Sequence, residues 1–372
     1  MADPIELKET IRMAGYACGF DQIGFAAAVP APHATEYQEW LNLGYHGDMA
    51  YMARKDAVRR RLDPTEALPE CRTIIVTSIA FGPTPISELN TANPKSSGGR
   101  RLPIIARYAM GRDYHDVFEE RLDCFAVEIK TRVPGVRTKR YVDYGPVLER
   151  DYAQQAGLGW IGKNTMLINP QLGSHVMLGE LLIDLELPPD DPFIPDHCGT
   201  CDRCVVACPT DAILPNRVLD ARLCISYLTI ELKGPIPEKL RPAVGQRVFG
   251  CDICQEVCPW NNKAATPSAW PFSLEPGQVF PVSEISTWSE ELLALDDESF
   301  RKRYKGTALA RPGRDGLLRN LAVGLGNSED KAVLPLLNRM LEDPSELIRE
   351  HARWAIRQLR ETEESPENTL HE

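Results

Sequence analysis

The spacing of apolar residues along the first 190 positions switches repeatedly between the helical and the strand period. Apolar residues three or four positions apart predict a helix, whereas short β-branched runs predict a buried strand. By these criteria we predict helices over residues 1–15, 113–132 and 147–156, and strands over 73–80, up to Val142 and over 175–187. Such alternation is typical of a mixed α/β or α+β domain, which we assign to residues 1–190.

The C-terminal part has a different pattern, because its apolar residues keep the helical period throughout. Three apolar sets, at residues 317–325, 333–341 and 347–359, are separated by short polar breaks. Two or three antiparallel helices of this length are typical of a small HEAT-type repeat. A plain helical cap on the core has the same spacing, so the pattern leaves both interpretations open.

Between these regions the composition changes to proline, glycine and polar residues. Residues 82–103 are predicted to be a surface loop, and residues 188–196, with four prolines and three aspartates, a linker. We therefore predict five segments: an α/β domain over 1–190, a cysteine-rich domain over 191–263, a connector over 264–290, a HEAT-like helical domain over 291–360, and an acidic, disordered tail over 361–372.

The overall composition is that of a soluble globular protein. The 372 residues are 43% hydrophobic and 26% charged. No apolar run approaches the roughly 20 residues of a membrane span, and the first 15 residues lack the apolar core of a signal peptide. We therefore expect a cytoplasmic protein with no membrane partner.

Charge is unevenly distributed along the chain. The net charge of −11 argues against a dedicated nucleic-acid binder, because such binding needs concentrated positive charge. Residues 300–319 nevertheless hold a single acidic residue and a set of basic ones, here called the basic stripe: Arg301, Lys302, Arg303, Lys305, Arg311, Arg314 and Arg319. A solvated charged surface is the plain explanation, and a phosphate-binding surface is the alternative.

Eight of the eleven cysteines fall between residues 198 and 258. The spacing Cys-x2-Cys-x2-Cys-x3-Cys-Pro from residue 198 is that of bacterial ferredoxins, in which the fourth cysteine ligates the other cluster. A second run starts at Cys251, where Val248 replaces the expected first cysteine and Cys224 is the available substitute. We predict two 4Fe–4S clusters, the first held by Cys198, Cys201, Cys204 and Cys258 and the second by Cys208, Cys224, Cys251 and Cys254.

Two zinc sites are the competing interpretation of these cysteines, because zinc also binds Cys-x2-Cys pairs. Zinc requires neither a third cysteine two residues further on nor a Cys-Pro ending that occurs twice. The pattern therefore favours clusters that carry single electrons. Cys18, Cys71 and Cys124 stand apart and are expected to be small apolar residues of the interior.

Other candidate chemistry is weaker. Asp143 lies between aromatic residues at a predicted strand end, where apolar surroundings raise a carboxyl pKa and suit a general acid, although aspartate is also common in turns. Residues 157–164 nearly form a phosphate loop, but Asn164 replaces the required Ser or Thr. His115 begins an incomplete corrinoid motif and is interpreted as a structural or surface histidine.

The chain resembles the epoxyqueuosine reductase family over nearly its whole length. The resemblance lies in Tyr-Val-Asp143-Tyr-Gly-Pro with Val-Leu-Glu-Arg after it, in the Gly-Trp-Ile-Gly162-Lys163-Asn164-Thr turn, in Gly173-Ser174 and Leu-Gly-Glu180, in both cysteine runs, and in the C-terminal helices. It implies a multidomain fold with a corrinoid-binding α/β domain, a ferredoxin-like double-cluster domain and a HEAT-like repeat. It also implies cobalamin, contacted by Arg61, Gly162, Lys163, Asn164, Ser226, Asp252 and Ile253.

The resemblance further implies a reaction. Cobalamin in its cob(I) state attacks the epoxide of epoxyqueuosine at the tRNA wobble position, the clusters deliver electrons, and Asp143 acts as general acid. The HEAT-like domain and the basic stripe are then expected to contact the tRNA backbone. The expected electron donor is of ferredoxin or flavodoxin type, and the expected state is monomeric.

Two other functions fit the cysteine pattern. A reductive dehalogenase combines a corrinoid with two such clusters, but it usually has an export signal and no HEAT-like end. An electron-transfer ferredoxin module without substrate chemistry would leave bound cobalamin unexplained. We rank the tRNA epoxide reductase first.

Overall fold

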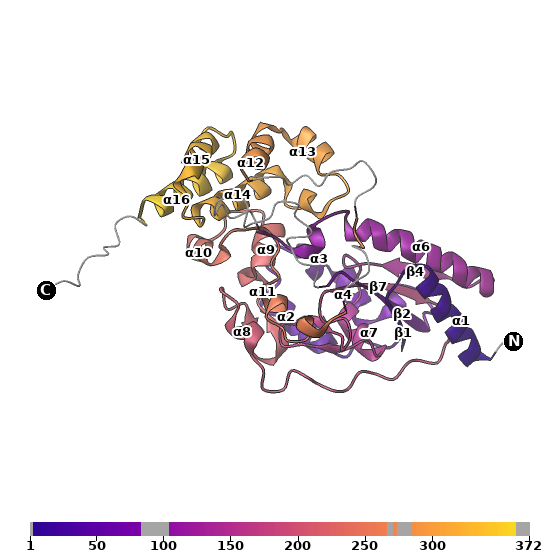
Figure 1. The fold of residues 1–372 in the computed structure, drawn as a ribbon. Coiled ribbons are helices and arrows are strands. Elements are labelled where there is room, and N and C mark those ends of the chain that lie inside the picture. Colours follow the sequence, from indigo (N-terminus) through magenta and orange to yellow (C-terminus); the bar gives the residue numbers. More distant parts are fainter. Residues whose placement is uncertain (1–2, 83–103, 266–270, 274–284, 362–372) are drawn as a thin grey trace. The chain divides into compact units, whose positions relative to one another are not determined.

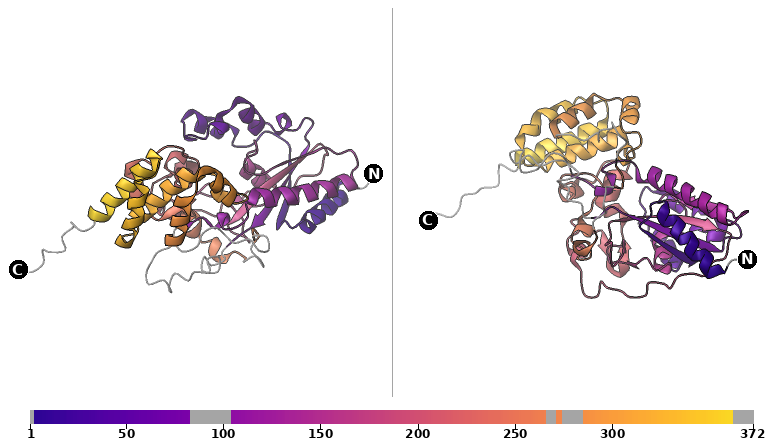
Figure 2. Two further views of the ribbon diagram at one scale, coloured as in Figure 1. Left: turned by 90° about the horizontal axis from the view of Figure 1, so that it is seen from above. Right: turned by 45° about the vertical axis from the view of Figure 1, so that its right-hand side comes forward.

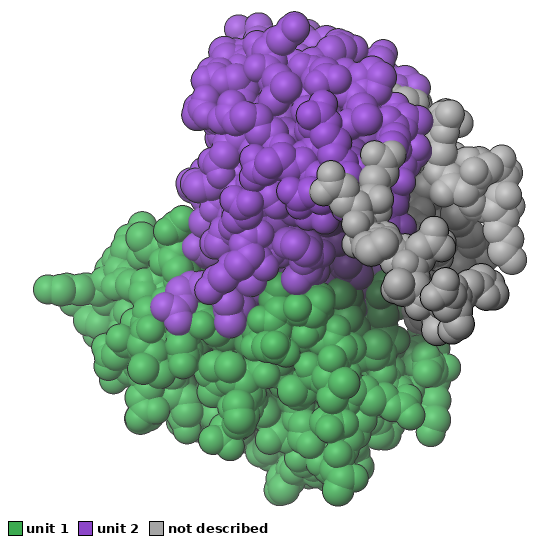
Figure 3. Space-filling view, turned by 90° about the vertical axis from the view of Figure 1, so that its left-hand side faces the viewer, with its two compact units in different colours: residues 1–84, 113–221, 253–273 green, residues 85–112, 222–252, 274–372 purple. Residues whose placement is uncertain are grey.

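The computed structural model describes residues 3–82, 104–265, 271–273 and 285–361. The predicted loop over 83–103, most of the connector and the tail from residue 362 lie outside these ranges. The chain divides into two compact units (Figure 3), which are described separately. Unit 1 comprises residues 1–84, 113–221 and 253–273, and unit 2 comprises 85–112, 222–252 and 274–372.

Unit 1 is built on a four-stranded sheet of order β1-β2-β7-β4 (Figure 1). Its strands are β1 (Gln22–Ala27), β2 (Thr73–Ala80), β7 (Val176–Ile183) and β4 (Thr138–Tyr141). Each neighbouring pair is antiparallel, and Glu180 of β7 lies opposite both Val76 and Tyr141. The predicted strand over 73–80 is confirmed. The antiparallel pairing makes this unit α+β rather than a parallel α/β fold.

Helices cover both faces of this sheet, which is why all eight positions of β2 are buried. Helices α1 (Pro4–Ala17) and α6 (Tyr114–Arg132) lie side by side on one face (Figure 2), and α7 (Glu149–Gln155) packs on the other. A Cβ atom on Gly179 would lie 2.6 Å from the Phe118 ring, so the glycine lets α6 approach the sheet.

The remaining elements of unit 1 are short. They are α2 (Ala34–Asn42), α3 (Ala50–Ala53), α4 (Lys55–Leu62), β5 (Trp160–Ile161), β6 (Leu167–Ile168), α8 (Arg203–Val206), β8 (Ile213–Leu214), β9 (Val218–Leu219) and α11 (Ile253–Glu256).

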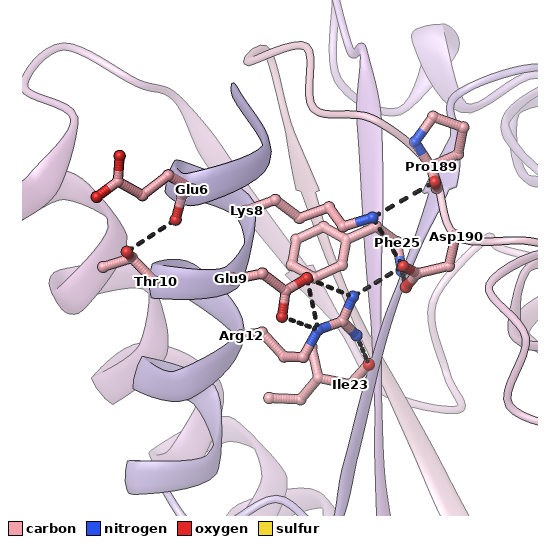
Figure 4. A network of polar contacts seen from close by, with 9 residues as sticks. All are labelled: Glu6, Lys8, Glu9, Thr10, Arg12, Ile23, Phe25, Pro189 and Asp190. Carbon is pink, nitrogen blue, oxygen red and sulfur yellow. Dashed lines mark hydrogen bonds and ion pairs between the residues drawn. The ribbon is translucent and has the colours of Figure 1, made fainter. Parts of the chain in front are cut away.

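The segment predicted to be a linker is fastened to the sheet at Asp190 (Figure 4). The Asp190 carboxylate accepts hydrogen bonds of 2.8 Å from both Lys8 Nζ and Arg12 Nη2, and one of 2.9 Å from the backbone N–H of Phe25. Burial opposes ionisation, but the hydrogen bonds from Arg12 and Lys8 hold the pKa of Asp190 below its usual value. Residues 188–190 therefore run along edge strand β1 as part of unit 1.

Unit 2 is mainly helical. Its elements are β3 (Ile104–Ile105), α9 (Ile225–Ile230), α10 (Arg241–Val244), β10 (Arg247–Phe249), α12 (Ile285–Ala294), α13 (Asp297–Arg303), α14 (Gly313–Gly326), α15 (Leu334–Met340) and α16 (Glu346–Glu361). Helix α14 packs against α16 and against β10, α9 and α10. The helices predicted from the three C-terminal apolar sets are confirmed as α14, α15 and α16. None of the helices among the described residues is long and apolar enough to cross a membrane.

Two polar residues of α14 bind the segment that carries Cys224 and Cys251. Arg319 is fully buried and donates to the carbonyl oxygens of Leu228, Leu232 and Gly234 at 2.8, 2.9 and 2.6 Å. Burial lowers the pKa of its guanidinium to about 10. The Asn320 side-chain amide donates to the carbonyl oxygens of Thr229 and Val248. These bonds satisfy backbone groups of a segment with little regular structure.

Two arginines of the basic stripe lie on α14 and are buried, so the predicted charged surface does not include them. Arg314 pairs with the buried Asp343 at 2.6 Å, and Arg319 has no solvent exposure. Neither side chain can therefore meet a phosphate at the surface, because both serve packing within unit 2. Arg301, Lys302, Arg303 and Lys305 are exposed on and just after α13.

Replacing Arg319 with Leu tests this role of α14. The variant leaves the buried carbonyl oxygen of Leu228 without its charged donor, at a cost of about 1–3 kcal/mol, and also removes the bonds to the partly buried carbonyl oxygens of Leu232 and Gly234. We expect a lower Tm, and an iron content that falls from about eight atoms per chain toward about four because the Cys224–Cys251 segment loosens. Arg301→Leu on exposed α13 is the control. Unchanged Tm and iron content in Arg319→Leu would contradict this role.

Candidate functional site

Four cysteines of unit 1 line one cavity of about 220 Å³. They are Cys198, Cys201, Cys204 and Cys258, the set predicted for the first cluster. The other residues that line it are Lys163, Asn164, Ile168, His197, Arg203, Pro259, Trp260 and Lys263.

The loop that carries the first three cysteines is held from several sides. Asp196 Oδ1 accepts from the Cys198 backbone N–H at 2.9 Å, and Lys163 Nζ donates to the carbonyl oxygens of Gly199 and Cys201, both at 2.8 Å. Trp160 Nε1 lies 3.5 Å from Cys198 Sγ, and its ring packs against Trp260 with centroids 5.0 Å apart. This loop is therefore held in place, with an aromatic side chain against Cys198.

The cavity suits a multi-atom cluster better than one zinc ion. Burial raises the pKa of the Cys204 and Cys258 thiols, so thiolates here need positive charge from a metal. A single zinc ion would draw four sulfurs to about 2.3 Å from one point. In the described ranges no three His, Cys, Asp or Glu side chains converge in this way, whereas the four cysteines surround a cavity.

The cysteines predicted for the second cluster are divided between the units. Cys208 and Cys254 belong to unit 1, and Cys224 and Cys251 to unit 2. Within unit 1, the backbone N–H of Ala212 donates to Cys208 Sγ at 3.3 Å. Within unit 2, Cys224 is the residue before helix α9. Their common ligation of one cluster stays a prediction.

Asp143 lies in a turn directly after β4, with a left-handed backbone (φ 43°) and a side chain that is 60% exposed. Tyr114 Oη donates to Asp143 Oδ2 at 2.5 Å, and His115 Nε2 lies 3.6 Å from the same oxygen. The Asp143 backbone N–H donates to Glu149 Oε1 at 2.5 Å. One carboxyl oxygen is thus held by the start of α6, and the backbone is held by the start of α7.

Two glutamates lie behind this turn on the α7 face of the sheet. Burial, and then the charge of Asp143, raises the pKa of Glu149 to about 8. Burial, and then the charge of Glu149, raises the pKa of Glu180, whose residue in β7 has no solvent exposure. Two neighbouring carboxyls in an apolar site cannot both ionise readily, so the pair holds at least one proton at neutral pH.

Arg61 of α4 is buried next to the same turn. Its Nη2 donates to the Gly145 carbonyl oxygen at 3.3 Å, and its guanidinium lies 5.9 Å from the centre of the Tyr37 ring. Its Nη1 is buried and has no hydrogen-bond partner among the described residues. Thr165, which follows Asn164, likewise has a buried hydroxyl without such a partner there, so unit 1 presents unused polar groups to a ligand.

The other predicted cofactor contacts lie in different places. Lys163 and Asn164 face the cysteine cavity, and Asn164 Nδ2 donates to the Cys254 carbonyl oxygen at 3.3 Å. Gly162 precedes them, and Ile253 begins α11 of unit 1. Ser226 and Asp252 belong to unit 2, where the Asp252 carboxylate accepts from the Arg107 backbone N–H at 2.7 Å.

Sequence reasoning assigned no role to Tyr114, His115, Glu149 or Glu180. The interpretation of His115 as a structural or surface histidine rests on an incomplete metal-ligand motif, which carries no information on a neighbouring acid. A signal was available for Glu180, since a glutamate within the apolar run Leu-Gly-Glu-Leu-Leu-Ile is costly to bury. The approach of α6 to the β4 turn is long-range and has no local signal.

Comparisons with known proteins agree with one family. Residues 61–144 match the model "Epoxyqueuosine reductase QueG, DUF1730", and residues 197–261 match "4Fe-4S double cluster binding domain". The epoxyqueuosine reductase of Pseudomonas aeruginosa is 42% identical over 97% of this chain and 96% of its own. That of Escherichia coli is 40% identical over 96% of this chain and 92% of its own.

Solved structures give the same result. A selenomethionine-labelled epoxyqueuosine reductase has a TM-score of 0.84 and 31% identity, covering 96% of this chain and 91% of its own. An epoxyqueuosine reductase with an epoxyqueuosine-modified tRNA-Tyr stem loop has a TM-score of 0.83 and 30% identity, covering 98% and 96%. The Bacillus subtilis enzyme, with its catalytic aspartate loop described as swung out of the active site, has a TM-score of 0.82 and 30% identity, covering 98% and 96%.

The raised pKa values of the buried glutamates predict a pH-dependent stability. Folding favours the protonated form of such a carboxyl. Its contribution to the free energy of unfolding is therefore complete below the unfolded pKa of about 4.5 and is lost as the pH rises through the folded pKa. Glu180→Gln removes one of the two charges. We expect its Tm to match that of the wild type near pH 5 and to exceed it by roughly 5 °C near pH 9.

Circular dichroism melts from pH 5 to 9 measure this difference. Glu39→Gln, on the exposed side of α2, is the matched control. Parallel curves of Tm against pH for Glu180→Gln and the wild type would mean that Glu180 carries no such penalty.

Proposed function

The chain belongs to the epoxyqueuosine reductases, and we propose that Asp143 is the group that protonates the substrate oxygen in its reaction. The protein is therefore an oxidoreductase of queuosine biosynthesis with two 4Fe–4S clusters, and the alternatives of a dehalogenase and a carrier module fall away. The observation that carries the proposed role is the position of Asp143, exposed at a strained turn and held by Tyr114 and His115.

Cobalamin is the second cofactor that we propose. When bound, it supplies a strong nucleophile toward an epoxide carbon, while the clusters supply electrons one at a time. The buried, unused Arg61 Nη1 and Thr165 hydroxyl support a large polar ligand in unit 1. Arg61, Gly162, Asn164 and Ile253 are its proposed contacts there, with Ser226 and Asp252 from unit 2. Lys163 is engaged with the cysteine loop and would contribute mainly through its backbone.

The chain's own residues then have distinct tasks. Asp143 donates a proton to the oxygen that leaves the carbon, since its exposed carboxyl can reach a bound base. Tyr114 orients that carboxyl, and Glu149 and Arg61 fix the backbone on either side of it. A wobble base must be unstacked to reach this turn.

The cellular setting follows from a tRNA substrate. We propose a cytoplasmic monomer that receives electrons from a ferredoxin- or flavodoxin-type donor. The same proposal includes the five predicted segments and the HEAT-like nature of helices α12–α16. It also includes ligation of the second cluster by its four predicted cysteines.

Anaerobic turnover is the deciding experiment. Protein with both clusters, cobalamin, a strong reductant and epoxyqueuosine-bearing tRNA should yield queuosine, a loss of one oxygen in the mass of the digested nucleoside. Asp143→Asn keeps the shape of the side chain and should lower kcat by about 10²- to 10⁴-fold with clusters and cobalamin still bound. Full activity in Asp143→Asn would transfer the acid role elsewhere, and turnover without cobalamin would remove that cofactor.

The exposed residues of α13 are the proposed contacts to the tRNA backbone. Reversal of Arg301, Lys302 and Arg303 to Glu should weaken binding of the tRNA and flatten its dependence on salt, without changing iron content. Binding is measured by fluorescence anisotropy at several salt concentrations. Reversal of Arg353, Arg357 and Arg360 to Glu, three exposed residues of α16, makes the same change of net charge and is the control. Unchanged affinity at low salt would exclude α13 from the interface.

A further inference from the structure

Three titratable side chains lie in a row where the start of α6 meets the turn after β4. They are Asp113, His115 and Asp143. Asp113 caps the helix, with its Oδ1 accepting from the His115 backbone N–H at 3.0 Å. The same Oδ1 lies 3.1 Å from His115 Nδ1, and His115 Nε2 lies 3.6 Å from Asp143 Oδ2. The imidazole therefore stands between two carboxyl groups, one on its own helix and one on the turn after β4.

We assign the hydrogen of the neutral His115 ring to Nδ1, because the Asp113 carboxylate 3.1 Å away can only accept. The lone pair then lies at Nε2, toward Asp143. The imidazolium form carries a second proton, on Nε2, which it can give. A distance of 3.6 Å exceeds that of a hydrogen bond, but catalytic contacts commonly tighten when substrate binds.

The reaction needs more protons than Asp143 can hold. Conversion of an epoxide into an alkene and water consumes two electrons, which the clusters deliver, and two protons. The first C–O cleavage leaves an oxygen that takes one proton and becomes a hydroxyl. The second C–O cleavage forms the double bond, and the departing hydroxyl takes the other proton and leaves as water. A single carboxyl must therefore be reloaded within one turnover.

We propose that Asp113, His115 and Asp143 form a relay that returns the second proton to Asp143. After Asp143 gives up its proton, the imidazolium transfers its Nε2 proton to Oδ2, and Asp143 can protonate the leaving hydroxyl. His115 Nε2 is itself buried, so the ring regains its proton through Asp143, whose side chain is 60% exposed and takes protons from water once the product has left. This inference rests on the proposed acid role of Asp143 and extends it.

The groups around the His115 ring are compatible with a relay in which the ring gains and loses a proton. Tyr144 lies with its ring centroid 5.3 Å from that of His115, and its hydroxyl is engaged by Glu119, which also pairs with Arg140. Burial raises the pKa of Tyr144 to about 12, so Tyr144 stays neutral. The titratable groups near His115 in the described ranges are Asp113, Tyr114, Asp143, Tyr144, and Glu119 with Arg140 behind them.

Replacement of His115 separates proton transfer from structure. His115→Gln keeps an amide donor near the Nε2 position but cannot pass a proton. We expect kcat to fall by about 10²-fold with little change in KM for tRNA, and the rise of kcat toward acidic pH to disappear. In His115→Ala, added imidazole should restore a large part of kcat, which a structural defect would not allow.

A spectroscopic measurement tests the relay without turnover. In cobalamin-free protein with ¹⁵N-labelled histidine rings, the resonance that His115→Gln removes should report hydrogen on Nδ1 in the neutral form. Asp113→Asn should lower the pKa of that ring. His33→Gln is the matched control, because His33 Nδ1 also pairs with a carboxylate, Asp151 at 2.6 Å, away from the turn.

The outcomes are distinct. Two results would overturn the relay but leave the acid role of Asp143 in place. One is hydrogen on Nε2 of the neutral His115 ring. The other is a wild-type kcat and pH profile in His115→Gln together with an inactive Asp143→Asn. If both His115→Gln and Asp143→Asn keep full activity, the acid role of Asp143 fails as well. No imidazole rescue in a well-folded His115→Ala would likewise contradict proton transfer through this residue.

Discussion

The geometry of the proposed active site depends on one short hydrogen bond, from the Asp143 backbone N–H to the Glu149 carboxyl. A non-glycine residue with positive φ is strained and persists only where its surroundings hold it. Glu149 at the start of α7 supplies that hold, and burial raises the pKa of the neighbouring Glu180, which disfavours a second negative charge there. The exposed Asp143 is thus held by the half-buried Glu149, which in turn neighbours the fully buried Glu180.

Polar side chains that are buried or half-buried have a similar task elsewhere in the molecule. Asp190 ties an extended segment to α1 and β1, Lys163 ties the first cysteine loop, and Arg319 with Asn320 ties the segment that carries Cys224 and Cys251. Segments near the cysteines have little helix or strand, so their backbone groups need partners of this kind. Polar side chains thus provide, for these segments, the backbone hydrogen-bond partners that regular secondary structure would otherwise supply.

Much of this arrangement could be predicted from the sequence where the signal is local. The strand over 73–80, the C-terminal helices and the first set of four cysteines follow from apolar spacing and from a tight ligand motif. The roles of His115 and Glu149 could not be predicted, because each depends on a contact between the turn after β4 and a helix whose position only the sheet register sets. The assignment of Arg314 and Arg319 to a phosphate-binding surface failed for the same reason. A positive charge in the sequence does not show that the fold brings Asp343 next to Arg314, or backbone carbonyl oxygens next to Arg319.

The first cysteine cavity also sets an order of events during synthesis. Three of its cysteines lie within residues 198–204, but the fourth, Cys258, belongs to a segment that returns to unit 1 after the chain has contributed to unit 2. At about 5–20 residues per second, Cys258 leaves the ribosome roughly 3–11 s after Cys204. During that interval the nascent chain carries three thiols with no complete cage around them. With the proposed ligand set, this cluster therefore assembles late, after the strands of the unit 1 sheet have been synthesised.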